Sequence, residues 1–424
     1  MSSETIASRM NQEGTTALVP KLRFPEYRGA SAWKSKRLGD LFSNRQETGL
    51  AGLPLLSLMD KEGIVPQEES NRKNNSNSDK SKYLRVVPGD IAYNTMRMWE
   101  GRSALAGLEG LVSPAYTVCE PKPGVHSLFF SFYLKSPQLI GQFRRFSQGI
   151  VKDTLNLKYP AFAQISALVP SYTEQQKIAD CLISLDELIA AQAQKAEALK
   201  THKKGLMQQL FPREGETQPR RRFPEFQNAG EWVAKRLDDL ARRGSGHTPN
   251  KRHPDYYNGG IKWVSLADSK RLDSGYISQT ESEISLEGIK NSSAVLHPTG
   301  SVLLSRDAGV GKSAVMDSPM AVSQHFIVWT CDSSRLSNWF LYYVLQGMKP
   351  VFERIATGST IKTIGLTFFK ELSIAVPAPK EQARIASCLS SLDALIIAES
   401  QKLEALKTHK KGLMQQLFPS TGVD

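Results

Sequence analysis

A long internal repeat is the feature that most constrains this chain of 424 residues. Residues 174–212 read EQQKIADCLISLDELIAAQAQKAEALKTHKKGLMQQLFP, and residues 381–419 read EQARIASCLSSLDALIIAESQKLEALKTHKKGLMQQLFP. The two segments match at 30 of 39 positions with an offset of 207 residues, and their last sixteen residues are identical. Because repeats at a fixed offset indicate equivalent structural units, we expect two modules built on the same frame.

The repeated segment predicts a long helix. No proline interrupts the chain from Glu174 to Leu210, whereas Pro170 and Pro212 flank this segment as helix breakers. Apolar residues recur in steps of four and three, and about 37 residues at 1.5 Å each give a helix near 55 Å long. Such an apolar seam needs a partner helix, and the simplest partner is the other copy. The predicted seam residues are Ile178, Leu182, Leu185, Ile189, Leu199, Leu206, Leu210, Ile385, Leu389, Leu392, Ile396, Leu403, Leu406, Leu413 and Leu417.

A shorter repeat opens each half of the chain. Arg23-Phe24-Pro25-Glu26-Tyr27 and Trp33 recur as Arg222-Phe223-Pro224-Glu225-Phe226 and Trp232, while the sequences that follow look largely unrelated. We therefore divide the chain into a disordered tail (1–19), a first module (20–170), a first spacer helix (171–212), a linker (213–221), a second module (222–377), a second spacer helix (378–419) and a tail (420–424).

Each module is predicted to be α+β. Short apolar stretches alternate with Gly, Pro and Asn, a pattern typical of the strands of a mixed sheet. The predicted strands are Leu84–Val87, Ile91–Tyr93, Ala115–Val118, Trp263–Leu266, Val302–Leu304 and Phe326–Thr330, and the predicted helices are Leu128–Phe143 and Asn338–Ile355.

The charge distribution points to a polyanionic ligand for the modules. Lys and Arg exceed Asp and Glu by 12, and the pI is about 9.4. The two repeats account for only +1, so +11 lies on the remaining 346 residues. A field of this sign favours nucleic acid, with a merely basic soluble protein as the alternative.

Composition also limits the compartment. No run of about 18 apolar residues predicts a membrane span, and the polar start lacks the apolar stretch of an export signal. The four cysteines form no CxxC pair and are too few for a disulfide scaffold, so we expect a cytoplasmic protein without a metal site.

Three local segments are candidates for a chemical role. Asp307–Ser313 contains Gly-x-Gly-Lys-Ser, but Arg306 stands where a phosphate loop needs its first glycine, so a Gly-rich loop with exposed Arg306 and Lys312 is expected. Asp255, Asp268 and Lys270 fit a loose pattern for a Mg²⁺-dependent nuclease, which arises often by chance. The polar stretch Asn71–Lys82 is a surface loop or an arm that orders on phosphates.

Taken together, these residues resemble the specificity (S) subunits of type I restriction–modification systems. Val169-Pro170 before Glu174-Gln175 resembles the family's entry into its spacer helix, and Val376-Pro377 before Glu381-Gln382 repeats it. The modules resemble two different classes of recognition domain, through the segments Gly89–Arg97, Val112–Tyr116, Gly246–Pro249, Ile261–Val264, Asp268, Ser305–Gly309 and Ser323–Gln324.

The resemblance implies two target-recognition domains on two long helices that pair as an antiparallel coiled coil. It further implies a non-catalytic chain without its own cofactor, which binds double-stranded DNA at a bipartite target. Two modification (methyltransferase) subunits would dock along the helices, and restriction (translocase–nuclease) subunits would join them, using S-adenosylmethionine, ATP and Mg²⁺. The alternatives are the nuclease above and a coiled-coil adaptor that does not bind DNA.

The predicted DNA-binding residues are polar or basic side chains in Gly-rich loops, because phosphate contacts set affinity and contacts to base edges set sequence preference. They are Asn94, Arg97, Arg102, Lys152, Thr154 and Lys158 in the first module, and Thr248, Lys251, Arg252, Arg306, Lys312, Gln324, Thr360 and Lys362 in the second.

Overall fold

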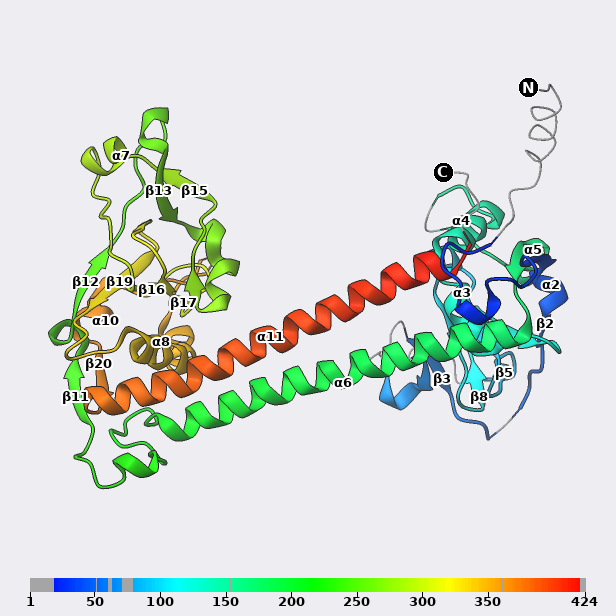
Figure 1. The fold of residues 1–424 in the computed structure, drawn as a ribbon, viewed down its shortest axis with the longest axis horizontal. Helices are drawn as coiled ribbons and strands as arrows, with labels where there is room; N and C mark the ends of the chain where they lie inside the picture. The colour runs from blue at the N-terminus through cyan, green and yellow to red at the C-terminus, as the bar shows by residue number, and fades with distance from the viewer. Residues whose placement is uncertain are drawn as a thin grey trace, which may run out of the picture. The chain divides into compact units, whose positions relative to one another are not determined.

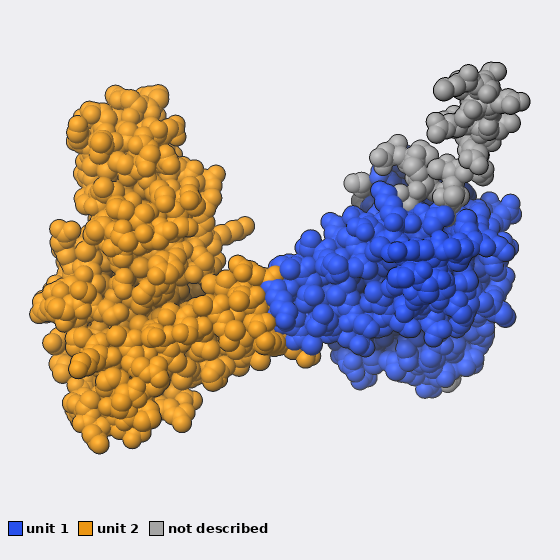
Figure 2. All heavy atoms as spheres, viewed as in Figure 1, with its two compact units in different colours: residues 1–192, 402–424 blue, residues 193–401 orange. Residues whose placement is uncertain are grey.

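The structure is a computed structural model that describes residues 19–50, 52–59, 63–70, 79–151, 154–359 and 361–419. The predicted tails, Lys152, Thr360 and most of the stretch Asn71–Lys82 lie outside these residues. The chain forms two compact units, coloured separately in Figure 2: residues 1–192 with 402–424, and residues 193–401. The two long helices α6 (Tyr172–Leu210) and α11 (Pro379–Leu417) each contribute to both units, so the division falls within the helices.

The first unit holds the first module. Its elements are β1 (Lys34–Arg37), α2 (Leu38–Leu41), β2 (Phe42–Asn44), β3 (Leu56–Met59), β4 (Gly63–Pro66), β5 (Leu84–Val86), β6 (Ile91–Asn94), β7 (Ser103–Leu105), β8 (Gly110–Val112), β9 (Tyr116–Pro121), α3 (Ser127–Tyr133), α4 (Pro137–Phe146), α5 (Tyr159–Gln164) and β10 (Ser166–Val169). Its main sheet is antiparallel with the strand order β2-β9-β6-β7.

The second unit holds the second module. Its elements are β11 (Val233–Arg236), β12 (Ala241–Ser245), β13 (Tyr257–Val264), β14 (Tyr276–Ile277), β15 (Ser282–Ile284), α7 (Leu286–Lys290), β16 (Val302–Ser305), β17 (Ser313–Met316), β18 (Ala321–Val322), β19 (Phe326–Cys331), α8 (Asn338–Gly347), α9 (Lys349–Ile355), α10 (Leu366–Glu371) and β20 (Ser373–Val376). Its five-stranded sheet has the order β12-β19-β16-β17-β14, and its first four strands pair as β2-β9-β6-β7 do. The modules therefore share a sheet that their unlike sequences conceal.

Each module is fastened to the start of one long helix by the residues of the short repeat. In the first unit, the buried Glu174 carboxylate accepts hydrogen bonds from Arg23 at 2.7 Å and from the Trp33 indole at 3.2 Å. In the second unit, Arg222 at 2.9 Å and Trp232 at 3.3 Å donate to Glu381 in the same way.

The glutamine that follows each of these glutamates completes the attachment. The Gln175 side chain accepts from the backbone of His126 at 2.9 Å and donates to the Pro170 carbonyl at 3.1 Å. Gln382 makes the equivalent bonds to Ser337 and Pro377. The first strand of each module also pairs with its last, β1 with β10 and β11 with β20. We call this set of contacts (Arg23, Trp33, Glu174, Gln175 and their second-unit equivalents) the module lock.

Ion pairs set the antiparallel direction of α6 and α11, which run side by side in Figure 1. Within the second unit, Lys195 pairs with Glu399 and Lys203 pairs with Asp393, each at 2.5 Å. A step forward along α6 is thus a step backward along α11. The equivalent pair in the first unit joins Lys410 to Asp186. The α+β fold class and the antiparallel coiled coil are confirmed.

The apolar seam is shared between the partner helix and the module cores. Ile178, Leu182 and Leu417 lie in the core of the first unit, and Ile385 and Leu389 lie in that of the second. The other predicted seam residues are half-buried, apart from the buried Leu210, and Gln192 is also buried in the seam. The ends of the helices are therefore held by the modules as well as by each other.

Several element predictions need correction. Leu128–Phe143 and Asn338–Ile355 are each two helices, because each holds a proline that lies in the first turn of a new helix, Pro137 as the first residue of α4 and Pro350 as the second residue of α9. The strand predicted at Trp263–Leu266 starts earlier, as β13, and ends at Val264, where the Ser265 side chain caps the following 3-10 helix.

Candidate nucleic-acid interface

Two loops meet at one edge of the main sheet in each unit. One loop joins the two strands of a hairpin, at residues 95–102 between β6 and β7 and at residues 306–312 between β16 and β17. The other loop, which we call the post-helix loop, follows α4 in the first unit and α9 in the second. Its described residues are 147–151 and 154–158 in the first unit, and 356–359 and 361–365 in the second. Their backbones bond at equivalent places, from Leu157 N–H to Thr95 O at 2.8 Å and from Ile364 N–H to Arg306 O at 3.0 Å. Most of the predicted DNA-binding residues that the structure describes lie on these loops.

In the first unit, the basic residues gather around one carboxylate. Arg97 and Arg102 both donate to Glu100, each at 3.0 Å. The Asn94 amide oxygen accepts from the backbone of Met96 at 3.0 Å, which shapes the turn after β6. Both arginines stay at the surface, with side chains 47% and 38% exposed, so they can reach a ligand while Glu100 orients them.

The post-helix loop of the first unit carries two further predicted residues, Thr154 and Lys158. Thr154 is exposed, and its hydroxyl bonds to the Val151 carbonyl at 3.0 Å, while Lys158 is exposed at the start of α5. Ile150, at the tip of this loop, is fully exposed. Sequence analysis did not select it, because an apolar residue in a loop carries no charge signal.

In the second unit, three of the predicted residues belong to one hydrogen-bonded chain. The Thr248 hydroxyl donates to the Gln324 side chain at 2.6 Å, and Gln324 contacts His325 at 3.4 Å. His325 bonds to Asp307 at 2.6 Å, and Arg306 pairs with the same carboxylate at 3.5 Å. The histidine and the aspartate were not predicted, although each is next in sequence to a residue that was.

Other predicted residues of the second unit are not part of this chain. Lys312 contacts the 3-10 helix Leu266–Ser274, where it donates to the Ser269 carbonyl at 3.0 Å and pairs with Asp273 at 2.9 Å. The expectation that Arg306 and Lys312 are exposed is wrong, because these ion pairs leave their side chains only 18% and 23% exposed. Lys362 is exposed on the post-helix loop, and Lys251 and Arg252 are exposed in the turn before β13.

Asp268, one of the three residues of the nuclease alternative, has a structural role. The Asp268 carboxylate is fully buried, accepts from the backbone of Ser265 and Glu281 at 2.9 and 2.7 Å, and pairs with Arg271. Within the described ranges, no group of three or more His, Cys, Asp or Glu side chains could hold a metal ion. None of the helices described is long and apolar enough to span a membrane.

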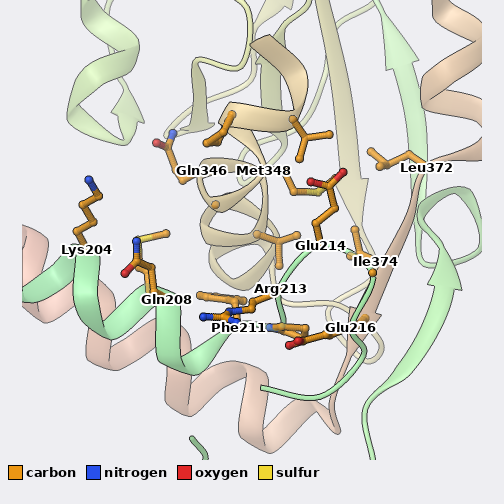
Figure 3. A pocket seen from close by; sticks show the side chains of 18 of the residues that line it. Lys204, Gln208, Phe211, Arg213, Glu214, Glu216, Gln346, Met348, Leu372 and Ile374 are labelled. Atoms are coloured by element: carbon orange, nitrogen blue, oxygen red, sulfur yellow. The ribbon is translucent and has the colours of Figure 1, made fainter. Parts of the chain in front are cut away.

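A cavity of about 1250 Å³ opens beside α6 in the second unit (Figure 3). Its apolar lining includes Phe211, Met348, Leu372 and Ile374, and Lys204 and Gln208 of α6 face it. Further basic residues lining it are Lys200, Lys203, Arg213 and Arg220.

Comparison with known proteins identifies the class of domain. Residues 229–408 match the family described as type I restriction modification DNA specificity domain. The type I restriction enzyme MjaIX specificity subunit of Methanocaldococcus jannaschii is 30% identical over 190 residues, which is 44% of this chain and 44% of that protein. The MjaVIII specificity subunit of the same organism is 23% identical over 360 residues, covering 80% and 82% of the two chains.

Two solved structures share the fold. A chain from the work on complex assembly and conformational transition of the type I R-M system aligns with a TM-score of 0.58 at 16% identity, over 92% of this chain and 98% of that one. The S subunit from M. genitalium aligns with a TM-score of 0.56 at 14% identity, over 95% and 100%. Residues 229–408 thus match a type I restriction modification DNA specificity domain, and the chain as a whole is similar to specificity subunits of type I restriction enzymes, although it spans less than half the length of the MjaIX subunit.

Proposed function

We propose that this chain is a non-catalytic DNA-recognition subunit that reads a bipartite, asymmetric target, one half-site per module. The observation that carries the proposal is the module lock, which fastens two modules with unlike loops to equivalent positions on two nearly identical helices. Two different surfaces on one repeated frame suit two different sequences separated by an unspecified gap.

The chemistry of the loops supports a division between phosphate and base contacts. Four basic side chains are exposed at positions outside helices and strands: Lys158, Lys251, Arg252 and Lys362. Contacts to phosphate groups do not depend on the base sequence, and exposed basic side chains suit such contacts. The orienting contacts of Arg97, Arg102 and Gln324 suit base edges, where geometry decides which base is accepted.

The long helices are proposed to carry two copies of a modification subunit. Leu188 in the first unit and Leu395 in the second occupy equivalent repeat positions, and they are 47% and 41% exposed. Equivalent apolar residues at the surface suit two copies of one partner. The apolar cavity beside α6 offers that partner a further contact in the second unit. The methyl donor, ATP and Mg²⁺ would be used by the partner subunits, including restriction subunits where these join.

Exchange of one module tests this proposal. Residues 20–170 or 222–377 are replaced by the corresponding module of another specificity subunit, the chain is expressed with its modification subunits, and methylated sites are mapped by sequencing. We expect one half-site to change and the other to stay. The chain alone, supplied with duplex, Mg²⁺, ATP and methyl donor, should neither methylate nor cut. A swap that alters both half-sites, or activity of the isolated chain, contradicts the proposal.

A further inference from the structure

The hydrogen-bonded chain of the second unit ends at the surface in an oriented amide. Asp307 is 9% exposed and His325 is 32% exposed by side chain, whereas Gln324 is an exposed residue. The chain therefore runs outward from a buried carboxylate, through the imidazole, to the Gln324 amide, with the Thr248 hydroxyl on the other side. We call these four side chains the Gln324 brace.

The backbone holds both sides of the Gln324 brace in place. The loop that carries Thr248 approaches the 322–325 turn closely, because a Cβ on Gly246 would lie 1.7 Å from the Val322 carbonyl oxygen. His247 N–H then donates to that carbonyl at 3.1 Å, and the Trp263 indole donates to the His247 carbonyl at 3.1 Å. Only glycine permits this approach, so Gly246 is what brings Thr248 to the amide.

Counting donors and acceptors shows what the amide still offers. A glutamine side chain has an oxygen that accepts two hydrogen bonds and a nitrogen that donates two. Thr248 uses one acceptor position, and His325 uses one N–H when its other ring nitrogen donates to Asp307. One acceptor and one donor therefore remain, side by side on an exposed group. This pair matches the adenine edge in the major groove, which presents an N6 donor and an N7 acceptor.

The fold itself does not require this side chain. The first unit has the same turn before β9, where Thr95 N–H donates to the Ala115 carbonyl at 3.1 Å as Arg306 N–H donates to the His325 carbonyl at 2.9 Å. At the position equivalent to Gln324 the first unit has Pro114, which has no polar side chain. The backbone frame is common to the modules, whereas the braced amide belongs to the second alone.

We propose that Gln324 reads one adenine in the half-site of the second module, and that Thr248 and His325 are positioning residues that fix the orientation of its amide. The inference rests on the proposed function and names one base and the residue that recognises it. Gln324 is a specificity-determining residue, since its two free polar positions discriminate the base without supplying charge.

The test maps methylated sites for the full chain expressed with its modification subunits, in wild type and in Gln324→Ala, Gln324→Glu, Thr248→Val and Thr248→Ser forms. The half-site of the second module is the one that changes when residues 222–377 are exchanged. In the wild type, one position of this half-site should require an A·T pair. Gln324→Ala should lower discrimination at that position roughly 5- to 150-fold and leave the other half-site unchanged. Gln324→Glu should shift preference there toward cytosine, whose N4 group donates.

The remaining variants separate positioning from a general surface effect. Thr248→Val should relax the same position without changing the salt dependence of binding, and Thr248→Ser, which keeps the hydroxyl, should restore it. Gln279→Ala, at another exposed glutamine of the second unit, should change nothing. A bipartite motif that all Gln324 variants leave intact overturns the inference alone, whereas the absence of a bipartite motif in the wild type overturns the proposed function.

Discussion

Replacing Glu381 by glutamine tests the module lock most directly. The Glu381 side chain is 1% exposed and accepts bonds from both Arg222 and Trp232, while the Arg222 side chain is 14% exposed. The substitution keeps the shape but removes the charge that compensates a largely buried guanidinium. Removing one partner of a buried ion pair costs about 3–5 kcal/mol, and we take the lower value because Arg222 is partly hydrated.

That loss of about 3 kcal/mol predicts a shift of roughly 6–12 °C in the unfolding temperature of the second unit, since 1 kcal/mol corresponds to about 2–4 °C at this size. Differential scanning calorimetry gives the transition, and hydrogen exchange with mass spectrometry assigns it to a unit. Exchange should rise in β11, β20 and the first turns of α11, with the first module unaffected.

The repeat supplies the matched control within the same molecule. Glu174→Gln should produce the equivalent loss in the first unit, somewhat larger because its partner Arg23 is only 7% exposed. Combined with Arg222→Met, Glu381→Gln should cost much less than the sum of the two single changes, because no unpaired charge remains. Unfolding temperatures unchanged within 1 °C, or destabilisation of both units by one substitution, would refute the attribution to the lock.

Two further predictions concern the helices and a buried histidine. Inserting four residues after both Gln192 and Glu399 lengthens each helix by about 6 Å, at 1.5 Å per residue. The mapped gap between the half-sites should therefore grow by roughly one to three base pairs, at 3.4 Å per base pair. An unchanged gap in a folded variant would show that the helix length does not set the gap. Burial lowers the pKa of His297, whose ring nitrogen Nε2 is buried without a partner. The unfolded chain then binds the proton more readily, so the free energy of unfolding of the second unit should fall as the pH drops below about 6.5. Urea titrations at pH 7.5 and 5.5 should show a smaller fall for the His297→Gln variant than for the wild type. An equal fall in both proteins would assign the effect to other groups.

The long helices of this molecule could be predicted from its sequence, whereas the contacts and the sheet order of the modules could not. The helices were predictable because proline brackets and a sustained apolar period act locally and repeat. The contacts of the short repeat were not predictable. Arg23 and Arg222 pair with glutamates about 150 residues away, and nothing in the local sequence marks which carboxylate will be buried. The common sheet order was likewise hidden, because strand pairing depends on burial and turns that many sequences satisfy.

The candidate interface shows the same limit at the level of single residues. Gln324 and Thr248 could be selected by chemical type and position in Gly-rich loops, but their contact depends on a close backbone approach at Gly246. Lys312 was selected for its charge and instead pairs with Asp273, because the sequence does not say which segments meet in the fold. The individual DNA contacts, the domain boundaries, and Lys152 and Thr360 stay predictions.

The backbone bond from Leu22 N–H to Gln416 O, at 3.0 Å, brings the two ends of the described chain close together. The last turns of α11 lie against the segment that leads into the first module, with Phe418 stacked on Tyr133 at 4.9 Å between ring centroids. The chain runs from the first module through α6, the second module and α11, and the end of α11 lies beside the start of the first module. A short linker could therefore join the two ends. A circular permutant that joins residue 419 to residue 20 through a short linker and opens within residues 213–221 should keep every contact of the fold. The order of the two modules along the gene would then depend only on where the closed path is cut, and the contacts within the fold would be unchanged.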